Sequence, residues 1–231
     1  MRTRFALSAV LAAAVLTAAA PTALAAGDGA RPAARSCGTL RLTGSLPVPP
    51  AGMAVQQDVS IGADCTPRPG AVRLVPVDRA KGAAPARRAT AAATATATDG
   101  AHHISSWNEM YDCCNIRMTG LYTTSDWTTG GGRVVTAATD ATEQHNREPW
   151  NAGWSLASSA HGADCTADCA ASHAEAHADF SYRGIFDVTG NWYANSHHSF
   201  VDLGADGTAS CRFDVELRHT FAGWNWRHGC A

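Results

Sequence analysis

Four side chains that can bind metals recur at every fourth position late in the chain, at Cys165, Cys169, His173 and His177. On a helix this spacing would place them in one stripe, because residues four apart lie on the same helix face. One ion could not reach all four, since twelve residues of helix extend about 18 Å and zinc–ligand bonds are only about 2.0–2.3 Å long. The metal-binding hypothesis is therefore restricted to His173 and His177.

The same segment also has the alternation of a half-buried β-strand. Alanines and aromatic residues occupy every second position from Ala174 to Tyr182, and polar residues stand between them. The alanine content of residues 164–178 favours a helix, but the alternation continues without a break, so we predict a strand and keep the helix as the alternative. On a strand, four polar side chains about 6.6 Å apart would share one face: His173, Glu175, His177 and Asp179.

Established catalytic motifs are absent from the sequence. It contains no His-Glu-x-x-His, no Gly-x-Ser-x-Gly, no phosphate-binding loop and no Cys-x-x-Cys. Asp202, Asp206 and Gly207 match part of a calcium-binding loop, but Gly204 and Phe213 stand where two essential ligands belong, so a hairpin turn is the better interpretation. We predict no cofactor and identify no catalytic residue.

Aromatic residues near turns and near the chain end form the candidate ligand-binding set. Exposed aromatic rings provide a large contact area at a small cost in entropy, as a polysaccharide- or protein-binding surface requires. The alternative is that the rings fill a core that is poor in Leu and Ile. The candidates are Trp150, Trp154, Trp192, Tyr193, Trp224 and Trp226.

Eight cysteines in a chain with an export signal indicate disulfides rather than metal thiolates. We predict Cys37–Cys65 and Cys211–Cys230. Adjacent cysteines rarely bond to each other, because an ordinary disulfide needs Cα atoms about 4.4–6.8 Å apart. Cys113 and Cys114 are therefore expected to bond to the two remaining cysteines, Cys165 and Cys169.

The N-terminal residues have the pattern of a signal peptide. Arg2 and Arg4 precede an apolar run over residues 5–20, and small residues follow at 23–25, so residues 1–25 are expected to be removed and the protein to be secreted to the cell exterior. No other segment reaches the roughly 18 apolar residues of a membrane span. Without the signal, 16 basic residues (18 − 2) oppose 20 acidic ones, a net charge of −4 that disfavours nucleic acid as a partner.

Composition divides the remaining chain into three parts. All seven tryptophans and all ten histidines lie in residues 102–231, where short alternating segments and turn signals predict a disulfide-braced β domain. Residues 26–77 contain short strand patterns but no aromatic residue, so we expect a small strand-containing arm. Residues 78–101 are rich in Ala and Thr and are expected to form a linker. Cleavage after Arg87-Arg88, which would make the arm a propeptide, is the alternative.

The sequence therefore predicts a mainly β protein, an antiparallel sandwich or a barrel-like domain with disulfides, preceded by the arm. The functional hypothesis is a secreted, non-catalytic binding protein for a glycan, an envelope component or a protein. The alternative is a secreted hydrolase or metal-dependent enzyme that uses His173, Glu175, His177 or Asp179. The sequence carries no signal for an oligomeric state.

Overall fold

The computed structural model describes residues 36–79, 99–146, 153–185 and 187–231. All of these belong to one compact unit, residues 34–231. The expected signal peptide, Trp150 and residues 80–98 of the expected linker lie outside the described residues.

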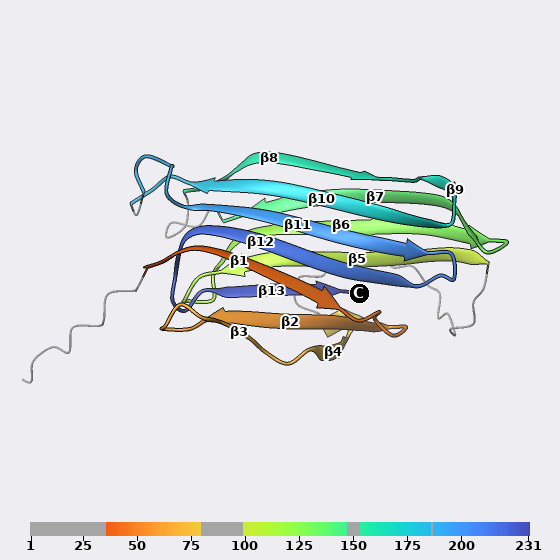
Figure 1. Ribbon diagram of the computed structural model, residues 1–231, viewed down its shortest axis with the longest axis horizontal. Coiled ribbons are helices and arrows are strands. Elements are labelled where there is room, and N and C mark those ends of the chain that lie inside the picture. Colours follow the sequence, from red (N-terminus) through yellow and green to blue (C-terminus); the bar gives the residue numbers. More distant parts are fainter. Residues whose placement is uncertain (1–35, 80–98, 147–152, 186) are drawn as a thin grey trace, which may run out of the picture. The chain divides into compact units, whose positions relative to one another are not determined.

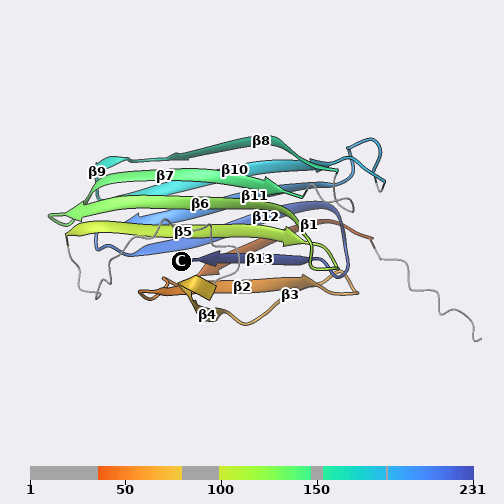
Figure 2. The ribbon, with the colours of Figure 1, turned by 180° about the vertical axis from the view of Figure 1, so that it is seen from behind.

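The unit is a sandwich of two antiparallel sheets, as the sequence predicts (Figure 1). The first sheet has the order β1-β12-β11-β10-β8, and the second has the order β3-β2-β13-β5-β6-β7-β9, with β4 paired to β2. The strands of the first sheet are β1 (Ser36–Leu46), β8 (Trp154–Ala163), β10 (Ala171–Tyr182), β11 (Ala194–Gly204) and β12 (Ala209–Phe221). Those of the second, seen from behind in Figure 2, are β2 (Met53–Ile61), β3 (Pro67–Pro69), β4 (Arg73–Pro76), β5 (Gly100–Tyr111), β6 (Arg117–Gly130), β7 (Arg133–His145), β9 (Ala167–Cys169) and β13 (Asn225–Cys230).

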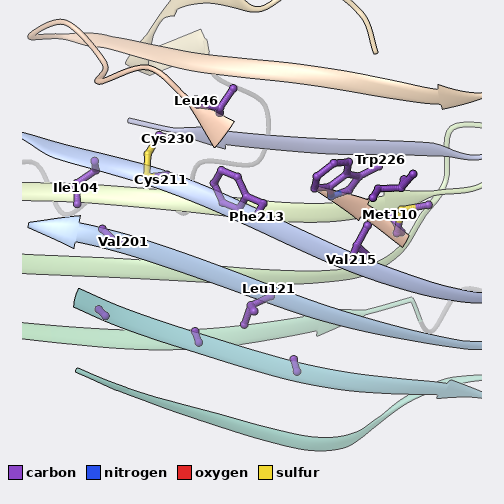
Figure 3. Packing of buried hydrophobic residues seen from close by; sticks show 14 of the residues in the cluster. Leu46, Ile104, Met110, Leu121, Val201, Cys211, Phe213, Val215, Trp226 and Cys230 are labelled. Atoms are coloured by element: carbon purple, nitrogen blue, oxygen red, sulfur yellow. A yellow bond between two sulfur atoms is a disulfide. The ribbon is translucent and has the colours of Figure 1, made fainter. Parts of the chain in front are cut away.

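Alternating side chains build the core between the sheets. On β10 the alanines and aromatic residues from Ala174 to Tyr182 are buried while their neighbours face outward, so the strand prediction for this segment is confirmed. The inward-facing residues of β12 repeat the pattern, and Figure 3 shows Phe213 and Val215 in the same buried cluster as Trp226. Large apolar surface removed from water on both sheets stabilises the sandwich.

The strands of the N-terminal segment, residues 36–76, belong to both sheets of the unit. β1 pairs with β12 in the first sheet, and β2 pairs with β13 in the second. Leu42 and Val55 are both buried in the main core of the unit. A segment without aromatic residues cannot form a core of its own, so it completes the sheets that the aromatic residues stabilise.

Tight turns with one left-handed residue connect several strands. In residues 204–208 the N–H of Gly207 donates to the carbonyl of Gly204, and Gly207 has φ +80°. The β5–β6 turn, residues 112–116, has the same arrangement with Asn115 at φ 64°. Glycine and asparagine tolerate this conformation best. Residues 204–208 thus form the hairpin turn preferred over a calcium loop.

Three disulfides brace the unit and are typical of an oxidising, extracellular-type environment. The structure contains the predicted bridges Cys37–Cys65 and Cys211–Cys230. The predicted bonds from Cys113 and Cys114 to Cys165 and Cys169 were wrong, because Cys165 bonds to Cys169 across the short β9. The β5–β6 turn and β9 lie at opposite ends of the sandwich, which leaves Cys113 and Cys114 free (Figure 1).

Within the described residues, no helix has the length and apolar character needed to cross a membrane.

Candidate functional site

The structure divides the six candidate aromatic residues by exposure. Trp154, Trp224 and Trp226 are only 4%, 6% and 0% exposed, and they have the role in the core that the sequence offered as the alternative. All three belong to the hydrophobic core cluster. Trp192 is 59% exposed, Tyr193 is half-buried, and Trp150 lies outside the described residues.

Trp192 belongs to the loop that joins β10 to β11, residues 183–193, which we call the Trp192 loop. It exposes two further apolar side chains, Ile185 at 82% and Val188 at 78%. Figures 1 and 2 show it at one end of the sandwich, on the same side as the β12–β13 connection. Clustered exposed apolar residues mark interaction sites more often than isolated ones do.

The carboxylate of Asp187 holds this loop in shape. One of its oxygens accepts hydrogen bonds from the backbone N–H and the hydroxyl of Thr189 and from the N–H of Gly190, at 2.7–3.1 Å. The other accepts from the N–H groups of Trp192, at 2.6 Å, and Tyr193, at 3.2 Å. Backbone groups that would otherwise require water are thus satisfied inside the loop. The exposed residues are therefore carried on an ordered framework.

These hydrogen bonds also determine the ionisation of Asp187. Desolvation raises its pKa, but the donors from Thr189, Trp192, Tyr193 and Gly190 outweigh desolvation and lower the pKa to about 2. A lowered carboxyl pKa means that the loop donors bind the ionised carboxylate more strongly than the protonated acid. The stabilisation of the loop by Asp187 is therefore fully present above the usual carboxyl pKa and is lost as the pH falls through about 2.

Ring contacts fix the far end of the loop to β12. Tyr193 stacks on Phe221 with ring centroids 5.6 Å apart. Trp192 stacks on His219 at 5.4 Å with the ring planes 27° apart. One face of the indole is therefore supported by an imidazole while more than half of the side chain remains exposed.

His219 reaches this position because β12 has a bulge there. β1 pairs Gly38 with Thr220 and Leu40 with Leu217, so that two residues of β12, Arg218 and His219, oppose the single residue between Gly38 and Leu40. His219 has φ 53°, a left-handed conformation that is unfavourable for a residue with a side chain. Bulges redirect side chains and are common near functional sites. Here the bulge aims the imidazole at Trp192.

Two arginines flank the same loop. The guanidinium of Arg183 donates to the carbonyl of Thr189 at 3.3 Å, and that of Arg218 donates to the carbonyl of Asn191 at 3.4 Å. Both side chains are exposed. The Trp192 loop thus combines a flat aromatic surface with hydrogen-bond donors, while its one acidic side chain is turned inward.

The second candidate region is the outer face of β10 and β11, where histidines face carboxylates. His173 lies 2.6 Å from Asp202, and His177 lies 3.1 Å from Asp179. His198 lies 3.4 Å from a third carboxylate and its ring centroid is 4.5 Å from that of His177. All of these side chains except Asp179 line an open depression of about 770 Å³. The hydrogen bond that His173 donates to Asp202 raises the pKa of His173.

The structure does not bring the two predicted metal ligands together. His173 and His177 are four residues apart on an extended strand, about 13 Å, and each contacts its own aspartate. Among the described residues, no three histidine, cysteine or carboxylate side chains converge as an ion would require. Glu175 contacts His198 at 3.4 Å, and Asp179 also accepts hydrogen bonds from Ser158 and Ser196.

A hydroxyl–imidazole–amide chain in the core has the geometry of a catalytic triad but no access. His197 lies 2.9 Å from the Thr119 hydroxyl and 3.0 Å from the Asn108 side-chain oxygen. All three residues are fully buried. Burial lowers the pKa of His197 to about 3. The neutral ring therefore serves as a polar bridge between the sheets, because a substrate cannot reach it.

Sequence analysis also missed a buried carboxylate on the opposite sheet. Glu109 accepts hydrogen bonds from Tyr111 at 3.0 Å, from Tyr122 and from Arg117 at 3.2 Å. Desolvation and the nearby Glu109 charge raise the pKa of Tyr111 to about 12 and also raise that of Tyr122. Tyrosines with raised pKa values donate hydrogen bonds and do not act as bases, so the cluster stabilises a buried charge.

Comparison with family models, with curated proteins and with solved structures found no match.

The sequence contains a signal for the brace of the Trp192 loop that sequence analysis did not use. Asp187 precedes Thr189 and Gly190, a pattern in which the side chain bonds to backbone two residues on and glycine provides a positive φ, here +75°. The contribution of His219 has no such signal. It depends on the bulge and on contact between strands that are distant in sequence.

Proposed function

We propose that this protein is exported and binds a ligand outside the cell without chemistry of its own, with Trp192 as the main contact. The observation that carries the proposal is that Trp192 alone among the described tryptophans is exposed, on a loop braced by Asp187 and backed by a strained His219. An unfavourable backbone conformation persists only when the surrounding structure enforces it. Its presence directly behind an exposed ring supports a functional surface.

Export is supported by the N-terminal sequence and by the chemistry of the cysteines. Residues 1–25 have the charged, apolar and small-residue regions of a signal peptide. Six of the eight cysteines are paired in disulfides, as in proteins of oxidising compartments.

The proposed ligand class is a polysaccharide of the cell exterior. A sugar ring presents a flat patch of C–H groups that packs on an aromatic face, and its hydroxyls need hydrogen-bond partners at the edge. Trp192 offers the aromatic face, because His219 covers only one side of it. Arg183 and Arg218 each donate one hydrogen bond to a carbonyl of the loop, and each guanidinium has further N–H groups that can donate to a ligand.

Retention on insoluble polysaccharides tests the proposal. Purified protein would be incubated with chitin, cellulose and peptidoglycan, and the bound fraction would be measured for wild type, Trp192→Ala, Trp192→Tyr and Leu156→Ala. We expect at least a tenfold loss of affinity, about 1.4 kcal/mol, in Trp192→Ala, and substantial rescue in Trp192→Tyr, which keeps an aromatic face.

Leu156→Ala is the matched control, because Leu156 is also an exposed apolar residue but lies on β8. Equal retention of wild type and Trp192→Ala would refute the role of Trp192. Failure of the wild type to bind any of the three polymers would refute the polysaccharide class.

The competing function, a metal-dependent hydrolase, is supported by the depression on the outer face of β10 and β11. The geometry favours it less, since three of its histidines, His173, His177 and His198, already face carboxylates. Stoichiometric zinc or copper in the purified protein, lost in His177→Ala, would favour this function over binding through Trp192.

A further inference from the structure

Cys113 and Cys114 form the tip of the β5–β6 turn and are the two free cysteines of the structure. Both are exposed. Their sulfur atoms lie 3.7 Å apart. The other six cysteines are paired in disulfides. Within the chain, each of these two thiols therefore has only the other as a possible bonding partner.

The turn itself holds the two thiols side by side. The N–H of Asn115 donates to the carbonyl of Asp112 at 3.1 Å, which closes the turn around both cysteines. The Asp112 carboxylate accepts from the N–H groups of Cys114, at 2.8 Å, and Ile116, at 2.9 Å. Asn115 adopts the left-handed conformation that ends the turn. The closeness of the sulfurs is thus a property of an ordered backbone.

Neither an activated nucleophile nor a metal site explains the pair. Partial burial, the hydrogen bond with Cys114 and the nearby negative charges raise the pKa of Cys113, whereas a cysteine that serves an enzyme as its nucleophile has a lowered pKa. Exchange with a disulfide needs only the thiolate fraction that is present at the working pH. No third metal-binding side chain joins them among the described residues. What the two thiols can do together is exchange with disulfides.

We propose that Cys113 and Cys114 are a reversible dithiol–disulfide couple that closes to a bond between adjacent residues by exchange with an external disulfide. One cysteine thiolate attacks a sulfur of the external disulfide, forming a mixed disulfide and releasing the first external thiol. The second cysteine then attacks the protein sulfur of the mixed disulfide, forming the Cys113–Cys114 bond and releasing the second external thiol. The two protons lost by the protein are carried by the two released thiols, so the protein is oxidised and the external disulfide reduced.

The backbone makes this bond labile, in contrast to the other three. Adjacent Cα atoms are about 3.8 Å apart, below the range of about 4.4–6.8 Å found for ordinary disulfides. The bonded cysteines of the other bridges have Cα atoms 5.2–6.3 Å apart. Strained and exposed disulfides are reduced more easily than structural ones. The couple is therefore expected to cycle under conditions in which the structural disulfides persist.

Alkylation under defined redox conditions tests this proposal independently of any ligand. The purified protein would be equilibrated in buffers of reduced and oxidised glutathione, treated with iodoacetamide, digested and analysed by mass spectrometry. With reduced glutathione in excess, we expect the peptide that carries Cys113 and Cys114 to take up two labels. With oxidised glutathione in excess, it should take up none and be lighter by two hydrogen atoms, in a protein that remains monomeric on a non-reducing gel.

Two single variants and the other disulfides provide the controls. Cys113→Ser and Cys114→Ser should each accumulate a stable glutathione adduct, because neither has a second thiol to release it. The Cys37–Cys65 and Cys211–Cys230 peptides should need at least about tenfold more reductant to open. Two labels under every condition, a stable adduct or disulfide-linked dimer in wild type, or opening of all four bonds together would each overturn the proposal.

Discussion

Two of the three tryptophan–histidine stacks among the described residues have the same angle between the ring planes and opposite surroundings. Trp226 stacks on His228 at 3.9 Å with the planes 27° apart, and both side chains are fully buried. Trp192 stacks on His219 at 5.4 Å with the planes also 27° apart, and the indole is mostly exposed. The buried pair lies on one regular strand, β13, whereas the exposed pair joins a loop to a bulge.

The difference lies in what each histidine does. His228 has no hydrogen-bond partner for either ring nitrogen among the described residues, so in the core it serves as an aromatic filler that must stay neutral. His219 supports an exposed ring at the expense of a strained backbone. The core stack contributes stability, while the loop stack is expected to contribute binding.

The largest effect should separate the two tryptophans by stability. Trp226→Ala removes a buried ring and its 2.7 Å hydrogen bond to Asn108, and we expect a loss of about 3–5 kcal/mol in the free energy of unfolding. Trp192→Ala should change it by no more than about 0.5 kcal/mol. Urea titration followed by circular dichroism measures both. Comparable losses in the two variants would contradict the assignment of Trp192 to a binding surface.

Acid should destabilise the protein through the buried stack. Burial lowers the pKa of His228 to about 4, whereas in the unfolded chain its pKa is about 6.5. Between these two pH values the unfolded chain therefore binds a proton that the folded protein does not. Stability should then fall with falling pH by about 1.4 kcal/mol per pH unit, or about 2 kcal/mol between pH 6.5 and 5. His197, with its pKa lowered to about 3, adds a similar loss.

His228→Leu provides the test of this pH dependence. The substitution should remove the part of the pH dependence that is due to His228. The free energy of unfolding at pH 7 should stay similar or rise, because no hydrogen bond of the imidazole is lost. Urea midpoints at pH 7 and pH 5 would show it. An unchanged difference between the two pH values in the variant would mean that His228 is not the source.

The exposed stack should depend on the brace behind it. Asp187→Asn keeps the shape of the side chain but loses the charge and one of the two acceptor oxygens, so the N–H groups of Trp192 and Tyr193 lose part of their bonding. We expect hydrogen exchange at these two amides to accelerate by about tenfold or more, with the β12 amides unchanged as the internal control. Equal acceleration throughout would indicate general destabilisation of the sandwich.

The smallest expected effect concerns the bulge and has opposite signs for stability and binding. His219→Gly relieves a left-handed conformation that costs a residue with a side chain about 1 kcal/mol, so the free energy of unfolding should stay constant or rise slightly. Retention on polysaccharide should fall, because Trp192 loses the ring behind it. If His219→Gly lowers stability while binding is kept, then His219 is a structural residue.

Sequence periodicity was sufficient for the fold but not for the site. The alternation from Ala174 to Tyr182 predicts a strand with one buried face, and the structure has it. The ends of this strand and its neighbours do not follow from the pattern, and neither does the pairing of the N-terminal strands with β12 and β13. Trp154 and Trp192 look alike in sequence, and only the direction of the ring relative to the two sheets distinguishes core from surface.

By itself the sequence determined the strand-forming alternation and the hairpin turn around Asp206, because each depends on spacing along the chain. It also predicted the Cys37–Cys65 and Cys211–Cys230 pairs, but not the Cys165–Cys169 bond. The tertiary structure decided which tryptophan is exposed, that Cys113 and Cys114 face each other, and that His219 lies behind Trp192. These are consequences of which strands lie side by side and where a strand bulges. Such pairings join residues that are distant along the chain, and local patterns do not encode them.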